Sequence, residues 1–204
     1  MSKIITIGRQ FGSGGRAMGE IIAKELNIPL YDKELVELAA KKSDVSLEAI
    51  KEIDERATNS LLYSVVMGSW GTRGINVPLY YEMPLNDKLF VAQSKIIKEL
   101  ADKGDCILVG RCADYVLAET DHDVLSVFVY APIDTKIEFA VNNLGVAREK
   151  AKDTLQKKDK QRKTYYDYYT NKKWGNIASY DLCVNVGKFG LEKAAKLVIE
   201  AYRG

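Results

Sequence analysis

Residues 4–16 read IITIGRQFGSGGR, and this stretch decides the fold. Ile4–Ile7 is apolar apart from Thr6, which is typical of a strand buried on both faces of a parallel sheet. Four glycines occupy the eight positions from Gly8 to Gly15, and the apolar residues that follow recur at helical spacing. A glycine-rich turn between a buried strand and a helix is the context in which such a turn binds phosphate.

The predicted loop, Gly8–Arg16, has the chemistry of a phosphate site. Glycine allows positive φ angles, so the backbone can curl and direct several N–H groups inward as a nest for phosphate oxygens. The helix that follows adds the positive end of its dipole. The alternative, a tight strand-to-helix turn without function, leaves four closely spaced glycines unexplained.

The loop departs from the standard pattern G-x-x-x-x-G-K-[ST] because it contains no lysine. If Gly12-Ser13-Gly14 is matched to the usual glycines, Gly15 stands in the lysine position and Arg16 in that of the magnesium-binding hydroxyl. Alternatively, the loop is one residue longer and Arg16 performs the lysine's role, although arginine prefers bidentate contacts with phosphate. The hydroxyl for Mg²⁺ would then come from Ser13 or be replaced by water.

The remainder of the chain alternates short apolar runs with amphipathic segments, which predicts an α/β fold with a parallel sheet. There is no internal repeat, so a single domain over residues 1–204 is expected. The five predicted strands are Ile4–Ile7, Ile28–Tyr31, Cys106–Val109, Val124–Tyr130 and Leu182–Val186.

Two segments are predicted to be mobile lobes inserted into this core. Residues 43–85 include an irregular stretch that mixes aromatic residues with loop formers. Residues 143–165 belong mostly to a long charged helix that is expected to face solvent along much of its length. The core is then made of residues 1–42, 86–142 and 166–204.

Two further groups of cations stand where they could reach the same ligand. Arg111 follows the third strand, and ligands of open α/β sheets bind beyond the carboxyl ends of the strands. A surface arginine in a turn is the alternative. Residues 157–162 read KKDKQR, which by itself is typical of a solvated charge run.

In this order, these elements resemble the cytidylate kinases, and more closely the cytidylate kinase-like group of bacterial proteins. The resemblance spans nearly the whole chain. It implies a P-loop NTPase-type three-layer sandwich, in which a five-stranded parallel sheet has helices on both faces, with a nucleoside monophosphate (NMP)-binding lobe and a lid. It also implies transfer of the γ-phosphoryl group from ATP to an NMP with Mg²⁺. The motifs that carry it are GRQFGSGGR, Tyr31-Asp32, Gly110-Arg111, Asp159-x-x-Arg162, YYxYYT at 165–170 and Trp174-Gly175.

The resemblance also implies a role for individual residues. Gly12, Ser13, Gly14, Gly15 and Arg16 would hold the donor phosphates, with Ser13 as a weak candidate for the Mg²⁺ hydroxyl. Asp32 would match an acidic residue near the acceptor site, and Arg111 the arginine that binds the acceptor phosphate. Asp159 and Arg162 would match the lid motif D-x-x-R. Several arginines suit this reaction, which needs positioning and cations on the migrating phosphoryl group.

The chain also departs from the cytidylate kinase pattern. Position 112 is cysteine where the motif G-R-D has aspartate, and the helix over 135–143 lacks the arginines found there in cytidylate kinases. The sequence therefore does not support cytosine specificity. Two other functions remain open. One is a nucleotide-binding regulatory module that has lost catalysis, and the other is a kinase of a non-nucleotide metabolite.

The tyrosines of residues 165–169 allow two interpretations. They could stack on a base, but packing of the lid helix against the core or against a second subunit is favoured, and the latter would make a homodimer. Net charge is +2, with 30 basic and 28 acidic residues, which argues against a nucleic acid polymer or a membrane surface as partner. The first apolar run is too short for a signal peptide or membrane span. With three scattered cysteines, this favours a cytoplasmic protein whose partners are nucleotide substrates.

Overall fold

The computed structural model describes residues 2–32, 34, 35, 37, 38 and 84–204. Five parallel strands form one sheet in the order β2-β3-β1-β4-β5, which confirms the predicted parallel α/β fold. The strand that precedes the glycine loop lies at the centre of this sheet. The strands are β1 Lys3–Arg9, β2 Leu30–Tyr31, β3 Cys106–Val109, β4 Asp123–Tyr130 and β5 Leu182–Asn185.

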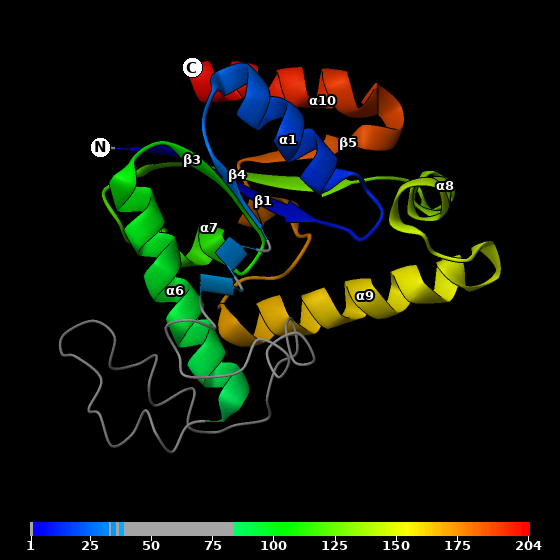
Figure 1. Ribbon diagram of the computed structural model, residues 1–204, viewed down its shortest axis with the longest axis horizontal. Coiled ribbons are helices and arrows are strands. Elements are labelled where there is room, and N and C mark those ends of the chain that lie inside the picture. The colour runs from blue at the N-terminus through cyan, green and yellow to red at the C-terminus, as the bar shows by residue number, and fades with distance from the viewer. Residues whose placement is uncertain (1, 33, 36, 39–83) are drawn as a thin grey trace.

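Helices cover both faces of the sheet, as the three-layer prediction requires (Figure 1). On one face lie α1 (Gly15–Leu26) and α10 (Val186–Arg203), and on the other lie α6 (Leu85–Lys103) and the short α7 (Ala113–Val116). A third group, α8 (Ile133–Leu144) and α9 (Arg148–Tyr169), extends beside the sheet as an arm. The 3₁₀ turn η1 (Ile177–Ser179) precedes β5.

Side chains of β1 point alternately to the two faces of the sheet and pack into two separate hydrophobic clusters. Ile5 and Ile7 are fully buried against α1 and α10, whereas Ile4 belongs to the opposite cluster, which is rich in aromatic residues from α6 and α9. A strand buried on both faces must be apolar at nearly every position. Thr6 is the exception, and its hydroxyl is buried on the aromatic side without a hydrogen-bond partner.

The predicted bounds hold for β3 but differ from the structure at the other four strands: β1 runs from Lys3 to Arg9, and β4 begins at Asp123. β2 is shorter than predicted because the N–H of Ile28 closes the end of α1 on the Ala23 carbonyl, so the chain becomes extended only at Leu30. β5 ends at Asn185, one residue earlier than predicted, because the Asn185 side chain accepts from the Lys188 N–H and caps the first turn of α10. Gly190 has non-helical angles (φ 74°, ψ 168°), so a kink separates this first turn from the rest of the helix.

The long charged helix is confirmed as α9. Its first half buries Ala151 and Leu155, its middle is largely exposed, and its last turns bury Tyr165, Tyr166 and Tyr169 in the aromatic cluster. The predicted lid, residues 143–165, therefore covers the end of α8, Gly145 and most of α9. The predicted lobe, residues 43–85, falls almost entirely outside the described residues.

Across the described ranges, no helix is both long enough and apolar enough to span a membrane.

Candidate functional site

The glycine loop forms a tight turn at the carboxyl end of β1. Gly12 and Gly14 have φ angles of 76° and 78°, in the left-handed region that glycine adopts without strain. Gly14 is also the N-cap of α1, so the loop runs directly into the positive end of a helix dipole. Inside the turn, the Ser13 hydroxyl donates to the Gln10 carbonyl oxygen at 2.8 Å. The two left-handed glycines curl the loop at the N-terminus of α1, and the Ser13 N–H closes the turn on the Gln10 carbonyl oxygen at 3.3 Å.

Strand β4 holds the beginning of the loop in place. The N–H of Gln10 donates to the Val129 carbonyl oxygen at 3.0 Å, which extends the β1–β4 pairing by one residue. The Gln10 side-chain oxygen accepts from the Ala131 N–H at 3.3 Å. Position 10 thus anchors the loop through both its backbone and its side chain.

The arm formed by α8 and α9 lies directly on the loop. Asp159 Oδ1 accepts from the Phe11 N–H at 2.6 Å, and Asp159 Oδ2 lies 3.0 Å from the Lys136 ammonium. Lys136 comes from α8 and its side chain is 9% exposed. The sequence predicted Asp159 as part of the lid but did not predict Lys136. The signal was available, because Lys136 follows β4 closely and therefore stands at the ligand-binding edge of the sheet.

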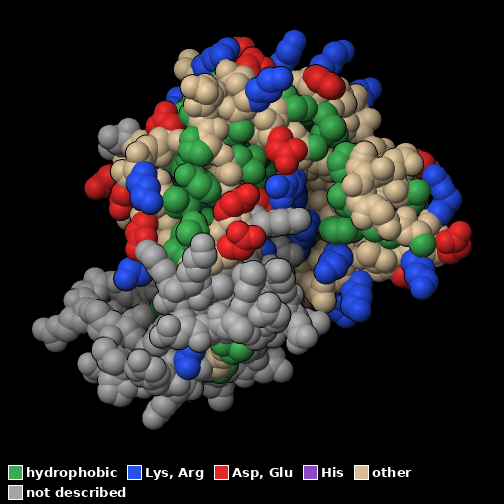
Figure 2. Space-filling model, viewed as in Figure 1, with side chains coloured by type: hydrophobic (Ala, Val, Ile, Leu, Met, Phe, Trp, Pro, Cys, Tyr) green, Lys and Arg blue, Asp and Glu red, His purple; other side chains and the backbone are tan. Residues whose placement is uncertain are grey.

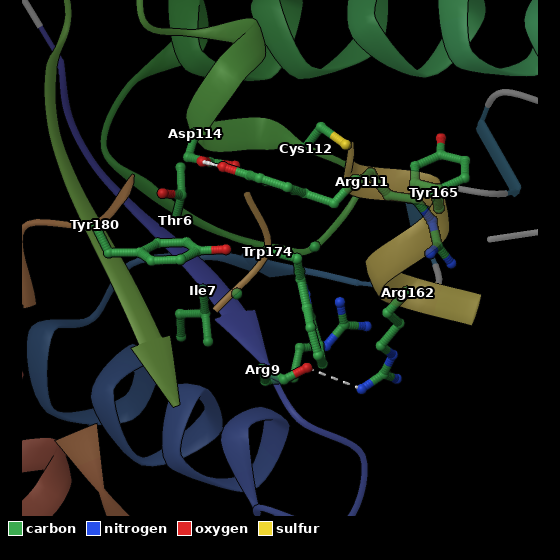
Figure 3. Close-up of a pocket in the computed structure, with 13 residues that line it drawn as sticks. Thr6, Ile7, Arg9, Arg111, Cys112, Asp114, Arg162, Tyr165, Trp174 and Tyr180 are labelled. Atoms are coloured by element: carbon green, nitrogen blue, oxygen red, sulfur yellow. Dashed lines mark hydrogen bonds between the residues drawn. The ribbon is translucent and has the colours of Figure 1, made fainter. Parts of the chain in front are cut away.

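Arg162 reaches the same loop one turn further along α9. Its Nη1 donates to the Arg9 carbonyl oxygen at 3.2 Å (Figure 3), and its guanidinium lies 5.6 Å from the centre of the Phe11 ring. The backbone carbonyl and the aromatic face together orient the guanidinium. Asp159 and Arg162, which are distant from the loop in sequence, are therefore brought onto it.

A second network ties Arg16 to the end of β2. Arg16 Nη1 lies 3.0 Å from Asp32 Oδ2, and Arg9 Nη2 lies 3.5 Å from Asp32 Oδ1. The Arg16 Nε also contacts Glu20 at 3.0 Å. Asp32 is buried, and a buried carboxylate needs a partner of opposite charge, which the two arginines supply. The residues predicted for the donor side and the acceptor side are thus joined through one carboxylate.

Arg111 is carried by a strained turn at the end of β3. Gly110, Arg111 and Cys112 have φ angles of 78°, 55° and 55°, three successive left-handed residues. For a residue with a side chain this conformation costs roughly 1–2 kcal/mol. Such strain persists where the surroundings hold a side chain in a required position. Here the turn holds Arg111 buried, at 7% exposure, in the wall of a cavity.

The cavity lies between the end of β1, the Arg111 turn and α9 (Figure 3). Three arginines from separate segments line it: Arg9, Arg111 and Arg162. The sequence predicted roles for Arg111 and Arg162 but none for Arg9. The enclosed space measures about 30 Å³, which is room for one or two water molecules, and the cavity is partly open to solvent. The lining residues are Thr6, Ile7, Gly8, Arg9, Gly110, Arg111, Cys112, Asp114, Arg162, Tyr165, Tyr166, Trp174 and Tyr180.

The tyrosines of α9 pack into the core, which confirms the favoured interpretation of Tyr165, Tyr166 and Tyr169. Tyr169 stacks on Phe90 with ring centres 4.3 Å apart, and its hydroxyl donates to Asp87 at 2.6 Å. The Tyr166 hydroxyl donates to Asp114 Oδ2 at 2.5 Å. The C-terminal turns of α9 are therefore fixed to the core. Seen from outside, basic and acidic side chains lie next to one another between the core and the arm (Figure 2).

Asp114 gives the cavity floor a pH-dependent stability. Burial raises the pKa of this carboxyl above its ordinary value of 3.8, against the opposing effects of the Tyr166 hydroxyl and Lys172. Protonation therefore favours the folded state. The stabilisation from Asp114 is present below pH 3.8 and is lost as the pH rises through the raised pKa.

Asp114→Asn should abolish this pH-dependent part of the stability, because asparagine resembles the protonated acid and can still accept a hydrogen bond from Tyr166. The melting temperature of the variant should match the parent near pH 4 and exceed it at pH 7, as measured by circular dichroism. The exposed Asp153→Asn serves as a control and should not change the pH profile. A parallel shift of the Asp114→Asn curve at every pH would contradict this explanation.

The fold and the site define a P-loop kinase-like α/β protein. The cytidylate kinase-like family matches residues 4–188, so the chain belongs to the cytidylate kinase-like family. Membership of a kinase family on this fold supports a phosphotransferase.

Individual relatives cover the whole length of the chain. A cytidylate kinase from Methanopyrus kandleri is 21% identical over 206 residues, which span 97% of this chain and 92% of the relative. The crystal structure of an uncharacterized protein from Eubacterium ventriosum is 28% identical, covers 100% of this chain and 99% of its own, and has a TM-score of 0.73. Shikimate kinase from Bacteroides thetaiotaomicron is 12% identical, with 99% of both chains covered and a TM-score of 0.53, which shows the fold alone.

Proposed function

We propose that this protein transfers the γ-phosphoryl group of ATP to a nucleoside monophosphate, with Mg²⁺. The observation that carries the proposal is the convergence of Arg9, Arg111 and Arg162 on one cavity beside a glycine-rich nest. The nest suits the phosphates of a donor, and the arginine-lined cavity suits the phosphate of an acceptor. Two neighbouring anion sites on one sheet edge are what phosphoryl transfer between two phosphate-bearing substrates requires.

In this reaction the protein's residues would act by positioning and by charge. Gly12, Ser13, Gly14 and Gly15 would line the donor phosphates, and Arg16 at the exit of the loop would add positive charge near them. Arg111 would hold the acceptor phosphate. Arg162, which already lies between the loop and the cavity, would contact the migrating group. Asp159 fixes the arm on the loop.

Mg²⁺ would supply positive charge at the donor phosphates. The Ser13 hydroxyl donates its proton to Gln10, which leaves oxygen lone pairs for a cation, although the residue is only 2% exposed. Asp32 and Asp159 are already paired with basic side chains. The residues therefore fit a Mg²⁺ ion held mainly by phosphates and water, as this ion is commonly held in kinases.

The proposal is tested by a ligand screen followed by an activity assay. Ligands that bind the native state raise its melting temperature, so each NMP and each nucleoside triphosphate is screened with Mg²⁺ by thermal shift. Pairs that stabilise the protein are then assayed for ADP release. ATP binding without turnover on any NMP would contradict the proposal and support a regulatory module. Turnover confined to a non-nucleotide acceptor would instead identify a metabolite kinase.

Residues 143–165 should behave as a lid in solution. Arg162 of α9 lines the cavity, and the middle of α9 is charged and exposed, which favours low local stability. Hydrogen exchange of amides in 143–165 should slow when a bisubstrate nucleotide is added, whereas amides of β1 should remain unchanged. Equal protection of 143–165 with and without ligand would contradict a lid.

A further inference from the structure

The loop of this protein lacks the lysine of the standard phosphate-binding motif, but a lysine reaches the loop from another element. Lys136 lies on α8, and its backbone is in close contact with Gly12: a Cβ added to Gly12 would lie 2.7 Å from the Lys136 carbonyl oxygen. Its side chain is 9% exposed, which is unusual for lysine. The loop that lacks the lysine of the motif is therefore the loop that Lys136 contacts.

The partner of Lys136 is a carboxylate that also contacts the loop. Asp159 Oδ2 lies 3.0 Å from the Lys136 ammonium, while Asp159 Oδ1 accepts from the Phe11 N–H at 2.6 Å. An anion is thus held between a loop N–H group and a lysine. A phosphate oxygen in a P-loop has this same pair of contacts, since backbone N–H groups and a lysine surround it.

Arg16 is less well placed for this role. Its guanidinium is bound to Asp32 at 3.0 Å and to Glu20 at 3.0 Å, and its side chain is 40% exposed. These contacts direct it toward β2 and along α1. Lys136, by contrast, is buried at the loop, and its ammonium pairs with Asp159 of the arm. A lysine is also the closer chemical match to the missing residue, because it acts as a compact point charge.

We propose that Lys136 is the donor-phosphate cation of this loop, and that Asp159 is an exchangeable anion that occupies its place until nucleotide binds. The inference rests on the proposed function, since it assigns a residue to the ATP site. When ATP binds, a phosphate oxygen replaces Asp159 at the Phe11 N–H and at the Lys136 ammonium. No bond is made or broken covalently in this exchange.

The exchange predicts opposite effects for the two members of the pair. Lys136→Met should weaken binding of ATP with Mg²⁺ by roughly 10- to 100-fold, because a charge-assisted contact with phosphate is lost. Asp159→Asn should tighten it by roughly 3- to 10-fold, because the competing negative charge is removed. Lys158→Met, at an exposed position next to Asp159, should change affinity less than about twofold.

Isothermal titration calorimetry on the full chain measures these affinities, with ATP and with inorganic tripolyphosphate as ligands. Tripolyphosphate has the phosphates without the base, so both ligands should lose affinity by the same factor in Lys136→Met. A change confined to ATP would place Lys136 at the nucleoside and overturn the inference. Arg16→Met is measured alongside, and its loss should be smaller than that of Lys136→Met.

The outcomes separate this inference from the proposed function. Failure of the parent protein to bind either ligand contradicts the ATP site itself. A parent that binds, with Lys136→Met binding equally well, overturns the role of Lys136 alone. Weaker binding in Asp159→Asn would show that the carboxylate supports the site and does not compete for it. Where Lys136→Met fails to fold by circular dichroism, the double variant with Asp159→Asn is compared with Asp159→Asn alone, and equal affinities overturn the inference.

Discussion

Arg162→Ala should lower kcat of phosphoryl transfer by roughly 10³-fold while changing the KM for ATP much less. Negative charge spreads over the oxygens of the migrating phosphoryl group, and a well-placed guanidinium stabilises this charge more strongly in the transition state than in the ground state. The structure places Arg162 between the loop and the cavity, with its Nη1 3.2 Å from the Arg9 carbonyl oxygen. It therefore needs little movement to reach a group in transfer.

The control for this prediction is another arginine of the same helix. Arg148 lies at the start of α9 and pairs with the exposed Glu138. Arg148→Ala should leave kcat within about twofold of the parent, because exposed ion pairs contribute little. Steady-state kinetics on the acceptor found by the ligand screen gives both values. If Arg162→Ala retained kcat within about threefold of the parent, Arg162 would be a structural contact of the arm and not a catalytic residue.

Gly12→Ala should destabilise the fold by roughly 2–5 kcal/mol or abolish ATP binding. Two costs add at this position. Its φ of 76° lies in the left-handed region, which costs a residue with a side chain roughly 1–2 kcal/mol. The added Cβ would also lie 2.7 Å from the Lys136 carbonyl oxygen and 2.8 Å from Leu155 Cδ2, and overpacking of this kind costs roughly 1–3 kcal/mol. Relief of these contacts requires α8 and α9 to move away from the loop.

A substitution at Gly145 separates the conformational cost from the steric cost. Gly145 has a similar φ of 67°, but apart from its chain neighbours no atom of the described residues lies within 4 Å of an added Cβ. Gly145→Ala should therefore lose only the conformational contribution, roughly 1–2 kcal/mol. Urea denaturation of both variants measures the difference in the free energy of unfolding, and ATP titration measures the loss at the site. Equal destabilisation by the two substitutions would show that the arm does not press on the loop.

The sequence predicted the strand, the glycine-rich turn and the helix of this loop well because the signal is local. An apolar strand, clustered glycines and a helical spacing occupy residues 4–26, and each depends on neighbours in the chain. The order Gly110-Arg111 after a strand was equally readable, since the edge at which parallel strands end follows from the fold class. What the sequence did not reveal was the strain at Arg111 and Cys112, because two successive left-handed residues with side chains arise from tertiary packing.

Helix α9 shows what amino-acid composition can predict and what it cannot. Its charge density predicted a solvent-facing helix, and most of its middle is exposed. Composition did not show that Tyr165, Tyr166 and Tyr169 would find partners on α6 and α7, including hydroxyl contacts to Asp87 and Asp114. Such pairs are more than fifty residues apart, so no periodicity along the chain records them.

By itself the sequence determined the five-stranded α/β architecture, the nest after β1 and the presence of arginines at several strand ends and on α9. These features follow from local backbone preference and from hydrophobic periodicity. Only the tertiary structure decided which cations share a site: Arg9 and Arg16 on Asp32, Arg111 and Arg162 on one cavity, and Lys136 with Asp159 on the loop. The physical reason is that a buried charge is tolerated only where packing brings a partner within a few ångströms, and that proximity is a property of the folded chain.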